Sequence, residues 1–234
     1  MCAPASSPES ATKSTTNRPP ASRSRRRSST SLPASAIGRG PFKRTRAESV
    51  NPAESSNRSV NWPRATPIVT DRLQLEPLAV HHASEMVETL SSPDLYTHIG
   101  GTSPSLSELE RLYALQSAGA SPTGDAGWLN WIVRETAESA AVGYVQATVT
   151  TVETGYQADI AWVIGVDSQG QGFATEAARA MVDWLADHLV TVLQAAIHPD
   201  NAASARIADR LGLQPTDEID DGEVIWRAET RTEE

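Results

Sequence analysis

Two glycines stand in the segment Gln169-Gly170-Gln171-Gly172-Phe173-Ala174, directly after an apolar strand-like run and before a long helical stripe. Without side chains at positions 170 and 172, an anion can approach the backbone closely. The N–H groups at a helix start lack internal acceptors and lie at the positive end of the helix dipole. The segment therefore predicts a site for phosphate oxygens.

Two common phosphate-binding loops do not fit this segment. A P-loop needs a Lys directly after its last glycine, whereas Phe173 follows Gly172. The dinucleotide pattern G-x-G-x-x-G lacks its third glycine, because Thr175 stands there. A dinucleotide-binding unit also belongs near the start of its domain, and three or four strand-like runs precede this turn. An unrelated nucleotide-binding protein is therefore a disfavoured alternative.

Hydrophobic periodicity places the turn late in a mixed series of strands and helices. The expected strands are 68–78, 128–134, 141–150, 157–166, 190–197 and 223–228. The expected helices are 82–90, 103–113, 173–189 and 202–211, with Ser103 as the N-cap of the second. His81 and His82 are expected on a helix surface. This order predicts an α/β fold in which a central mixed sheet carries helices on both sides.

The first sixty residues differ in composition from the rest. They hold 11 Lys and Arg against 3 Asp and Glu, whereas the remainder holds 9 against 26, and all six Trp lie at or after Trp62. We expect residues 1–62 to be a disordered basic tail rich in Ser, Pro and Arg, or translated sequence upstream of the true start, and residues 63–230 to be the folded domain. A nucleic-acid-binding arm and an organelle transit peptide are alternatives for the tail.

Composition also argues against several classes of protein. Cys2 is the single cysteine, so one chain can form neither a disulfide nor a cysteine-based metal site. The five histidines show no metal-binding spacing, and we expect no metal. No apolar run is long enough for a membrane helix, and none follows the basic cluster as a secretory signal requires. We expect a cytoplasmic protein, either monomeric or homodimeric.

The turn and its surroundings resemble the GNAT superfamily of N-acyltransferases. Gln169-x-x-Gly172-x-Ala174, continued by Thr175-Glu176-Ala177, matches the Q/R-x-x-G-x-G/A signature of that family. Thr70-Asp71-Arg72-Leu73-x-Leu75-x-Pro77-Leu78 is similar to the opening strand of the Rim-type branch, which acetylates protein N-termini. Asp159–Trp162 resembles the acidic strand of that branch. The segment from Asp200 to Ser204, with its ending Leu211-Gly212-Leu213, is similar to the Asn-x-x-Ser helix of the branch.

The resemblance implies the GNAT fold, which has a mixed, mostly antiparallel sheet, helices on both faces and a splayed pair of strands. It also implies acetyl-CoA as co-substrate, with its pyrophosphate held by backbone amides of the turn. The strand before the turn and the helix after it would bind the pantetheine arm. The residues implied for coenzyme A binding are Ile164, Val166, Gln169, Gly170, Gln171, Gly172, Phe173, Ala174, Thr175 and Asn201.

Acyl transfer to an amine needs a base for the amine proton and an acid for the leaving thiolate. Many family members use a Tyr of the last helix as the acid, and Ala208 stands at that position here. The Ser of the Rim-type motif makes Ser204 the candidate acid, and a Ser that satisfies only backbone groups is the alternative. Asp159 is a candidate for the base, with a solvated strand residue as the alternative, and His198 is a candidate for a proton relay, with a structural His bonded to its loop as the alternative. Further candidates for the base are Glu223 and the pair Asp220-Asp221, for which a solvated turn is the alternative.

Strand alternation places Trp128 and Asn130 on one face and Trp131 on the other. We expect Trp128, Asn130 and Gln146 to line an acceptor pocket, with core packing as the alternative reading. Glu76 stands where Rim-type relatives carry an Arg.

The acidic balance of the folded part favours a cationic acceptor, such as a polyamine, an aminoglycoside or a basic peptide N-terminus, over nucleic acid. It also requires local donors for the phosphates of coenzyme A, and the nearest candidates are Arg179, Arg206 and Arg210. The favoured function is an acetyl-CoA-dependent N-acetyltransferase that acts by direct attack in a ternary complex, with no membrane partner. The alternative is a non-catalytic acyl-CoA sensor of the same fold, which the missing Tyr favours.

Overall fold

The fold is that of a computed structural model, which describes residues 61–153 and 155–230 of the chain. The strands are β1 (Ile68–Val69), β2 (Leu73–Pro77), β3 (Gly127–Glu135), β4 (Ala141–Val152), β5 (Gly155–Ile164), β6 (Val190–Ile197), β7 (Gln214–Asp220) and β8 (Glu223–Glu229). The helices are α1 (Ala83–Thr89), α2 (Tyr96–Ile99), α3 (Leu106–Gln116), α4 (Phe173–Ala186) and α5 (Ala202–Arg210). Short 3₁₀ turns cover Val80–His82, Pro93–Leu95 and Val166–Ser168. The expected tail lies almost wholly outside the described residues.

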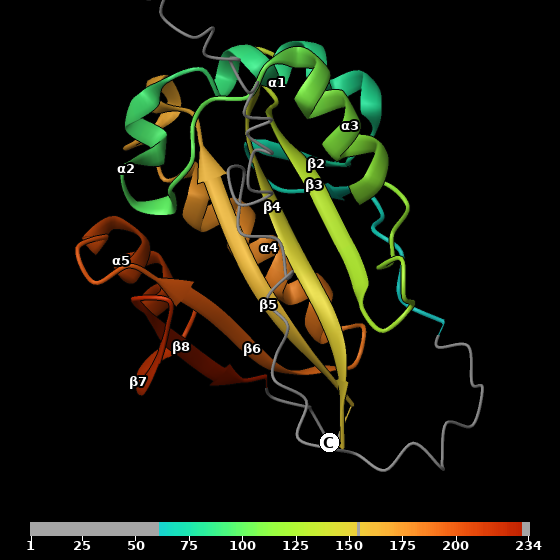
Figure 1. Cartoon of the computed structure of the whole chain (residues 1–234), viewed down its shortest axis with the longest axis vertical. Helices are drawn as coiled ribbons and strands as arrows, with labels where there is room; N and C mark the ends of the chain where they lie inside the picture. The colour runs from blue at the N-terminus through green and yellow to red at the C-terminus, as the bar shows by residue number, and fades with distance from the viewer. Residues whose placement is uncertain (1–60, 154, 231–234) are drawn as a thin grey trace, which may run out of the picture. The chain divides into compact units, whose positions relative to one another are not determined.

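The strands form one sheet in the order β1-β2-β3-β4-β5-β6-β8-β7 (Figure 1). Every neighbouring pair is antiparallel except β5 and β6, which run parallel. The connection between those two strands contains α4, as a parallel crossover requires. The expectation of a mixed, mostly antiparallel sheet is confirmed.

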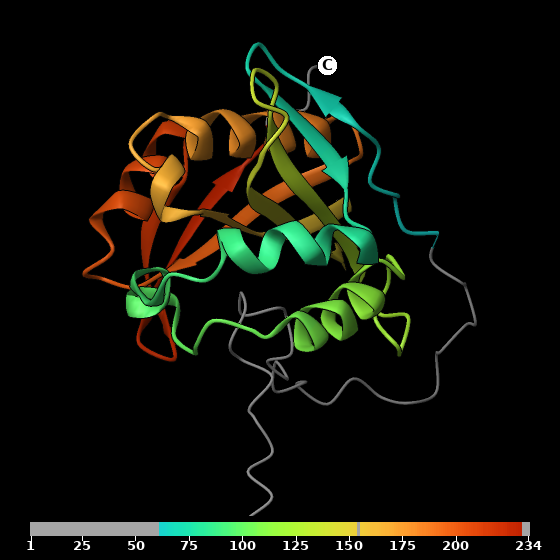
Figure 2. The ribbon, with the colours of Figure 1, turned by 90° about the horizontal axis from the view of Figure 1, so that it is seen from above.

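Helices cover both faces of this sheet (Figure 2). One face, which we call the α1 face, carries Ile132 and Tyr144 in a core shared with α1 and α3. The opposite α4 face carries Trp131 and Val145 in a larger core shared with α4 and α5. Trp62, at the expected domain boundary, is buried in that larger core. Since successive strand residues point to opposite faces, each strand contributes to both cores.

Strands β5 and β6 separate after a short paired stretch. Their pairing runs from Tyr156 with Val190 to Asp159 with Gln194 and then stops, although β5 continues to Ile164. Figure 1 shows the two strands diverging toward their carboxyl ends. The splayed pair is therefore present, and residues 160–164 of β5 have no strand partner on the β6 side among the described residues.

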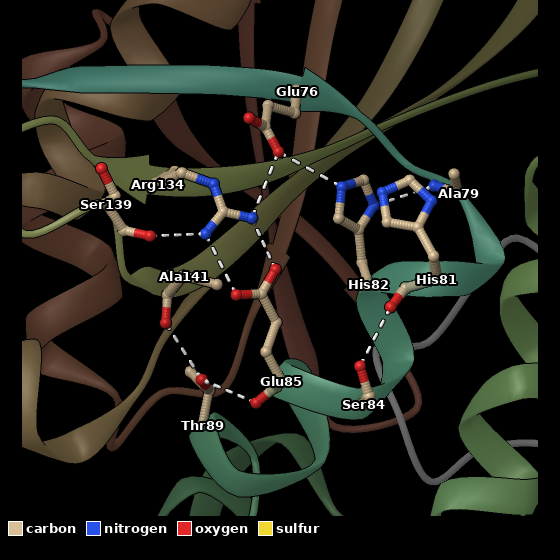
Figure 3. Close-up of polar contacts among 10 residues, drawn as sticks. All are labelled: Glu76, Ala79, His81, His82, Ser84, Glu85, Thr89, Arg134, Ser139 and Ala141. Carbon is tan, nitrogen blue, oxygen red and sulfur yellow. Dashed lines mark hydrogen bonds and ion pairs between the residues drawn. The ribbon is translucent and has the colours of Figure 1, made fainter.

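A partly buried ionic network fixes α1 against the sheet (Figure 3). Arg134 of β3 bonds both Glu85 of α1, at 2.5 Å, and Glu76 of β2, at 3.2 Å. The Ala79 N–H donates to Nδ1 of His82 at 3.0 Å, so the proton on Nε2 faces Glu76 at 3.2 Å. The expectation of a surface position for His82 is wrong, because its ring is 3 % exposed. Glu76 therefore belongs to a network that ties β2, β3 and α1 together.

Several elements differ from the sequence expectations, among them the expected strand 68–78, which is divided into β1 and β2. Helix α3 begins at Leu106, two residues later than expected, because Glu108 accepts the Ser105 N–H at 2.9 Å and caps the helix there. Helix α4 ends at Ala186, and Leu189 lies exposed in the following turn with φ of 64°. Strand β7 is not expected from the sequence, because it is a polar, mostly exposed edge strand without hydrophobic alternation. Within the described residues, no helix is long and apolar enough to cross a membrane.

Candidate functional site

The glycine turn has the backbone geometry that its residue types predict. Gly170 has φ of 75° and Gly172 has φ of 86°, the left-handed region that residues with a Cβ avoid. Helix α4 begins at Phe173, and its first helical bond joins the Glu176 N–H to the Gly172 carbonyl at 3.1 Å. The side chain of Gln169 donates to the Ile164 carbonyl at 3.0 Å and closes the base of the turn.

The backbone N–H groups of this turn have no acceptor within the described part of the chain. From Gly170 to Thr175, none of the six donates a hydrogen bond to any residue in the described ranges. They surround the positive end of a 14-residue helix. An anion with several oxygens is the ligand that satisfies such a set of donors.

The open edge of β5 adjoins this turn. Backbone groups of residues 160–164 that face β6 have no strand partner in the described structure. Ile164 is buried, whereas Val166, just beyond the strand, is exposed. An extended ligand that carries amide groups can pair with this edge as an additional strand would.

The start of α5 lies beyond the end of β6. The side chain of Asn201 accepts the Ser204 N–H at 3.0 Å and caps the helix. This bond leaves the Asn201 amide group as a donor. The Ser204 hydroxyl is half-buried and makes no hydrogen bond to the described residues. Ala208, at the position where relatives carry Tyr, is fully buried in the core of the α4 face.

Asp159 occupies the last paired position before β5 and β6 separate. Its register neighbours are Thr148 on β4 and Gln194 on β6. Burial raises the pKa of the Asp159 carboxyl to about 6, and the positive charge of Arg227 partly opposes that rise. A carboxyl with this pKa can accept a proton near neutral pH.

His198 lies at a distance from Asp159. It follows the end of β6, four residues beyond Gln194, which corresponds to about 13 Å along a strand. Its Nδ1 accepts the Asp200 N–H at 3.2 Å. The ring of His98 on α2 lies 5.6 Å from the ring of His198, centroid to centroid. The sequence offered no signal for His98, because the position of α2 depends on tertiary packing.

The predicted acceptor residues share the α1 face with Asp159. Trp128, Thr148 and Asp159 are in register across three strands, so Trp128 and Asp159 are roughly 10 Å apart. Asn130 pairs with Gln146 in the adjacent row. A pocket of about 100 Å³ between β3 and the end of α3 is lined by Trp128 and Asn130, but its described lining does not include Gln146. Both Asn130 and Gln146 are buried.

The remaining predicted groups have other surroundings. The Arg179 guanidinium donates to the backbone carbonyl of Arg210 and so joins α4 to α5, while Arg206 is exposed. Asp220, Asp221 and Glu223 lie in the hairpin between β7 and β8. Among the described residues, no group of three or more His, Cys, Asp or Glu is placed to hold a metal ion.

Comparison with known proteins adds a family and a set of similar folds. The family model "Acetyltransferase (GNAT) domain" matches residues 72–214. No curated protein matches the chain.

Three solved structures illustrate the fold similarity. An acetyltransferase of the GNAT family from Bacillus anthracis has 18 % identity and a TM-score of 0.56, and the match covers 70 % of this chain and 98 % of that one. RimL, a ribosomal alpha-N-protein acetyltransferase solved with coenzyme A, has 16 % identity and a TM-score of 0.55 over 70 % and 98 %. An aminoglycoside acetyltransferase, also solved with coenzyme A, has 19 % identity and a TM-score of 0.55 over 67 % and 94 %. At these identities the matches establish the fold alone.

Proposed function

Because the chain belongs to the GNAT acetyltransferase family, we propose that it transfers the acetyl group of acetyl-CoA to a primary amine. The observation that carries the proposal is the set of six backbone N–H groups, from Gly170 to Thr175, that lack an acceptor among the described residues. They would bind the pyrophosphate, assisted by Gln169, which closes the turn. The open edge of β5 as far as Ile164, Val166 just beyond the strand, and the Asn201 amide would hold the pantetheine arm.

In the proposed reaction, Asp159 accepts a proton and Ser204 donates one. As the amine nitrogen bonds to the acetyl carbon and the carbon–sulfur bond breaks, Asp159 takes the proton from the amine. Ser204 gives a proton to the departing sulfur. The half-buried Asp159, with a pKa of about 6, supports the first role, and the unengaged Ser204 hydroxyl supports the second. His198 would relay protons at the outer end of the splay.

The acceptor would approach on the α1 face. Trp128 and Asn130 line a pocket on this face, and Trp128 is in register with Thr148 and, through it, with Asp159. Gln146 lies beside Asn130 in register. The acidic charge balance of the folded part favours a cationic amine or a basic peptide N-terminus. The Rim-type resemblance favours the peptide N-terminus among these. We propose a cytoplasmic protein, monomeric or homodimeric, whose folded domain has no nucleic-acid or membrane partner.

A non-catalytic acyl-CoA sensor is the second candidate. Ala208 favours it, because a buried methyl group cannot protonate a thiolate. Release of free thiol from acetyl-CoA in the presence of an amine panel separates the two functions. The enzyme releases thiol only when an amine is present, whereas a sensor binds acetyl-CoA and releases none with any amine.

The binding site is tested by titration calorimetry with acetyl-CoA. We expect the native chain to bind and the Gly172→Trp variant not to bind, because a side chain at a position with φ of 86° both strains and fills the turn. Gly222→Trp, in the distant hairpin with φ of 84° and open space around it, is the matched control. Equal affinities of the native chain and the Gly172→Trp variant would contradict the assignment.

A further inference from the structure

Arg72, at the foot of β2, reaches across to the glycine turn. Its Nε donates to Glu176 at 2.7 Å and its Nη2 pairs with the same carboxylate at 2.5 Å. Its Nη1 donates to the backbone carbonyl of Gln171 at 3.0 Å. The guanidinium carbon lies 4.9 Å from the centroid of the Phe173 ring. One side chain therefore contacts the turn, the first residue of α4 and an acid in the first helical turn.

The contact between Arg72 and the Gln171 carbonyl fixes the direction of the Gly172 N–H. In a trans peptide the carbonyl and the following N–H point in opposite directions. With the Gln171 carbonyl bonded to Arg72, the Gly172 N–H points away from Arg72, and it donates to no acceptor among the described residues. Gly172 has no side chain to hinder rotation of this peptide, so the restraint has to come from outside the turn.

Glu176 completes the arrangement. A carboxylate in the first turn of α4 would repel a bound pyrophosphate if it faced the ligand. Instead Glu176 accepts hydrogen bonds from the Thr70 hydroxyl at 2.6 Å and from the Arg72 N–H at 3.1 Å, in addition to the guanidinium. The acid is thus turned toward β2, and its charge is offset there.

We propose that Arg72 is a positioning residue for pyrophosphate binding, an inference that rests on the proposed function. Arg72 acts on the backbone of the turn and does not contact the anion. Its Nε, Nη1 and Nη2 are all directed to Glu176 and Gln171, and Glu176 compensates its charge. Thr70 and Glu176 hold Arg72 in place. This gives a role to the segment Thr70-Asp71-Arg72-Leu73, to which the proposed function assigns none.

The test compares two ligands by titration calorimetry on the full chain. Coenzyme A carries the pyrophosphate, and pantetheine lacks it. We expect Arg72→Ala to weaken binding of coenzyme A about tenfold. Without Arg72 the Gly172 N–H is no longer held toward the pyrophosphate, and the loss of one hydrogen bond to a charged group has about this effect. Pantetheine affinity should stay within about twofold, because its site on β5 does not depend on the direction of the Gly172 N–H. Arg111→Ala, an exposed change on α3, is the control.

A second variant separates geometry from charge. Arg72→Lys keeps the positive charge but cannot bond Glu176 and Gln171 together, so it should lose coenzyme A affinity nearly as Arg72→Ala does. Full affinity in Arg72→Lys would overturn the inference, since it would mean that charge alone matters. Unchanged coenzyme A affinity in Arg72→Ala, or an equal loss for both ligands, would also overturn it. If the native chain itself fails to bind coenzyme A, the proposed function fails instead.

Discussion

Asp159 is the residue whose chemistry depends most on its surroundings. Its carboxyl is half-buried at the point where β5 and β6 part, and burial raises its pKa to about 6. As the base, it must be ionised, so the rate of acetylation should rise with pH through about 6. The Asp159→Asn variant should lose this rise with pH, and its kcat should be about 10²- to 10⁴-fold lower. Profiles of kcat against pH for both proteins test this, and an unaltered rise with pH in Asp159→Asn would assign the base elsewhere.

His82 should make the free energy of unfolding depend on pH. Burial and the neighbouring His81 lower the pKa of His82 below its usual 6.5, so the folded state favours the neutral ring. Below pH 6.5 the unfolded chain then binds more protons, and the free energy of unfolding should fall as the pH drops through that range. His82→Gln should remove this slope.

The raised pKa of Asp159 opposes the effect of His82, because it favours the folded state as the pH falls from about 6 toward 3.8. Urea unfolding between pH 5 and 7 in the Asp159→Asn background isolates the histidine. If His82→Gln leaves the slope unchanged in that background, the histidine does not carry it.

The glycine turn and Asn201 could be inferred from the sequence, because chain neighbours fix their geometry. Gly170 and Gly172 take positive φ, and Asn201 caps α5, as local rules predict. Arg72 could not be found in this way, since its partner Glu176 lies 104 residues away. The burial of His82 does not follow from local periodicity either: its partner Glu76 is close in sequence but lies on β2, and the position of that strand against α1 is set by tertiary packing.

At the scale of elements, β4 packs very closely on the end of β5 that lies beside the splay. Gly143 pairs with Ile164, and a Cβ at Gly143 would lie 2.1 Å from the Val163 carbonyl. Gly143→Ala should therefore cost about 3 kcal/mol or more of unfolding free energy. Gly124→Ala, in open space but with φ of 76°, should cost only about 1 kcal/mol. Equal costs in urea unfolding would show that the strands can separate without penalty.

The core strands and long helices follow from hydrophobic periodicity, as β3 to β6 and α4 show. Edge strand β7 has no such pattern, because six of its seven residues are exposed and its pairing with β8 alone defines it. Helix α2 spans only four residues, which is too short for a hydrophobic pattern to predict it. Sequence therefore predicts the long, amphipathic or buried elements better than short helices and polar edge strands.

At the scale of the whole molecule, the net negative charge of the folded part should affect binding of the acceptor. Outside residues 1–60, acidic residues outnumber basic ones by 26 to 9. The KM for a cationic acceptor should therefore rise with salt as the Debye length shortens from about 10 Å at 0.1 M toward 3 Å at 1 M. An amine with no second charge is the control and should show a smaller rise. Equal salt dependence for both acceptors would mean that the global charge does not guide capture.

In the proposed function, the chain acetylates an amine with acetyl-CoA. Mass spectrometry of an amine and peptide library, incubated with acetyl-CoA that carries an isotopically labelled acetyl group, tests it most directly. We expect labelled acetyl groups on one class of amine, formed by the native chain and lost in Gly172→Trp. If acetyl-CoA binds but no member of the library gains the label above the level without protein, the chain is a sensor and the catalytic account is wrong.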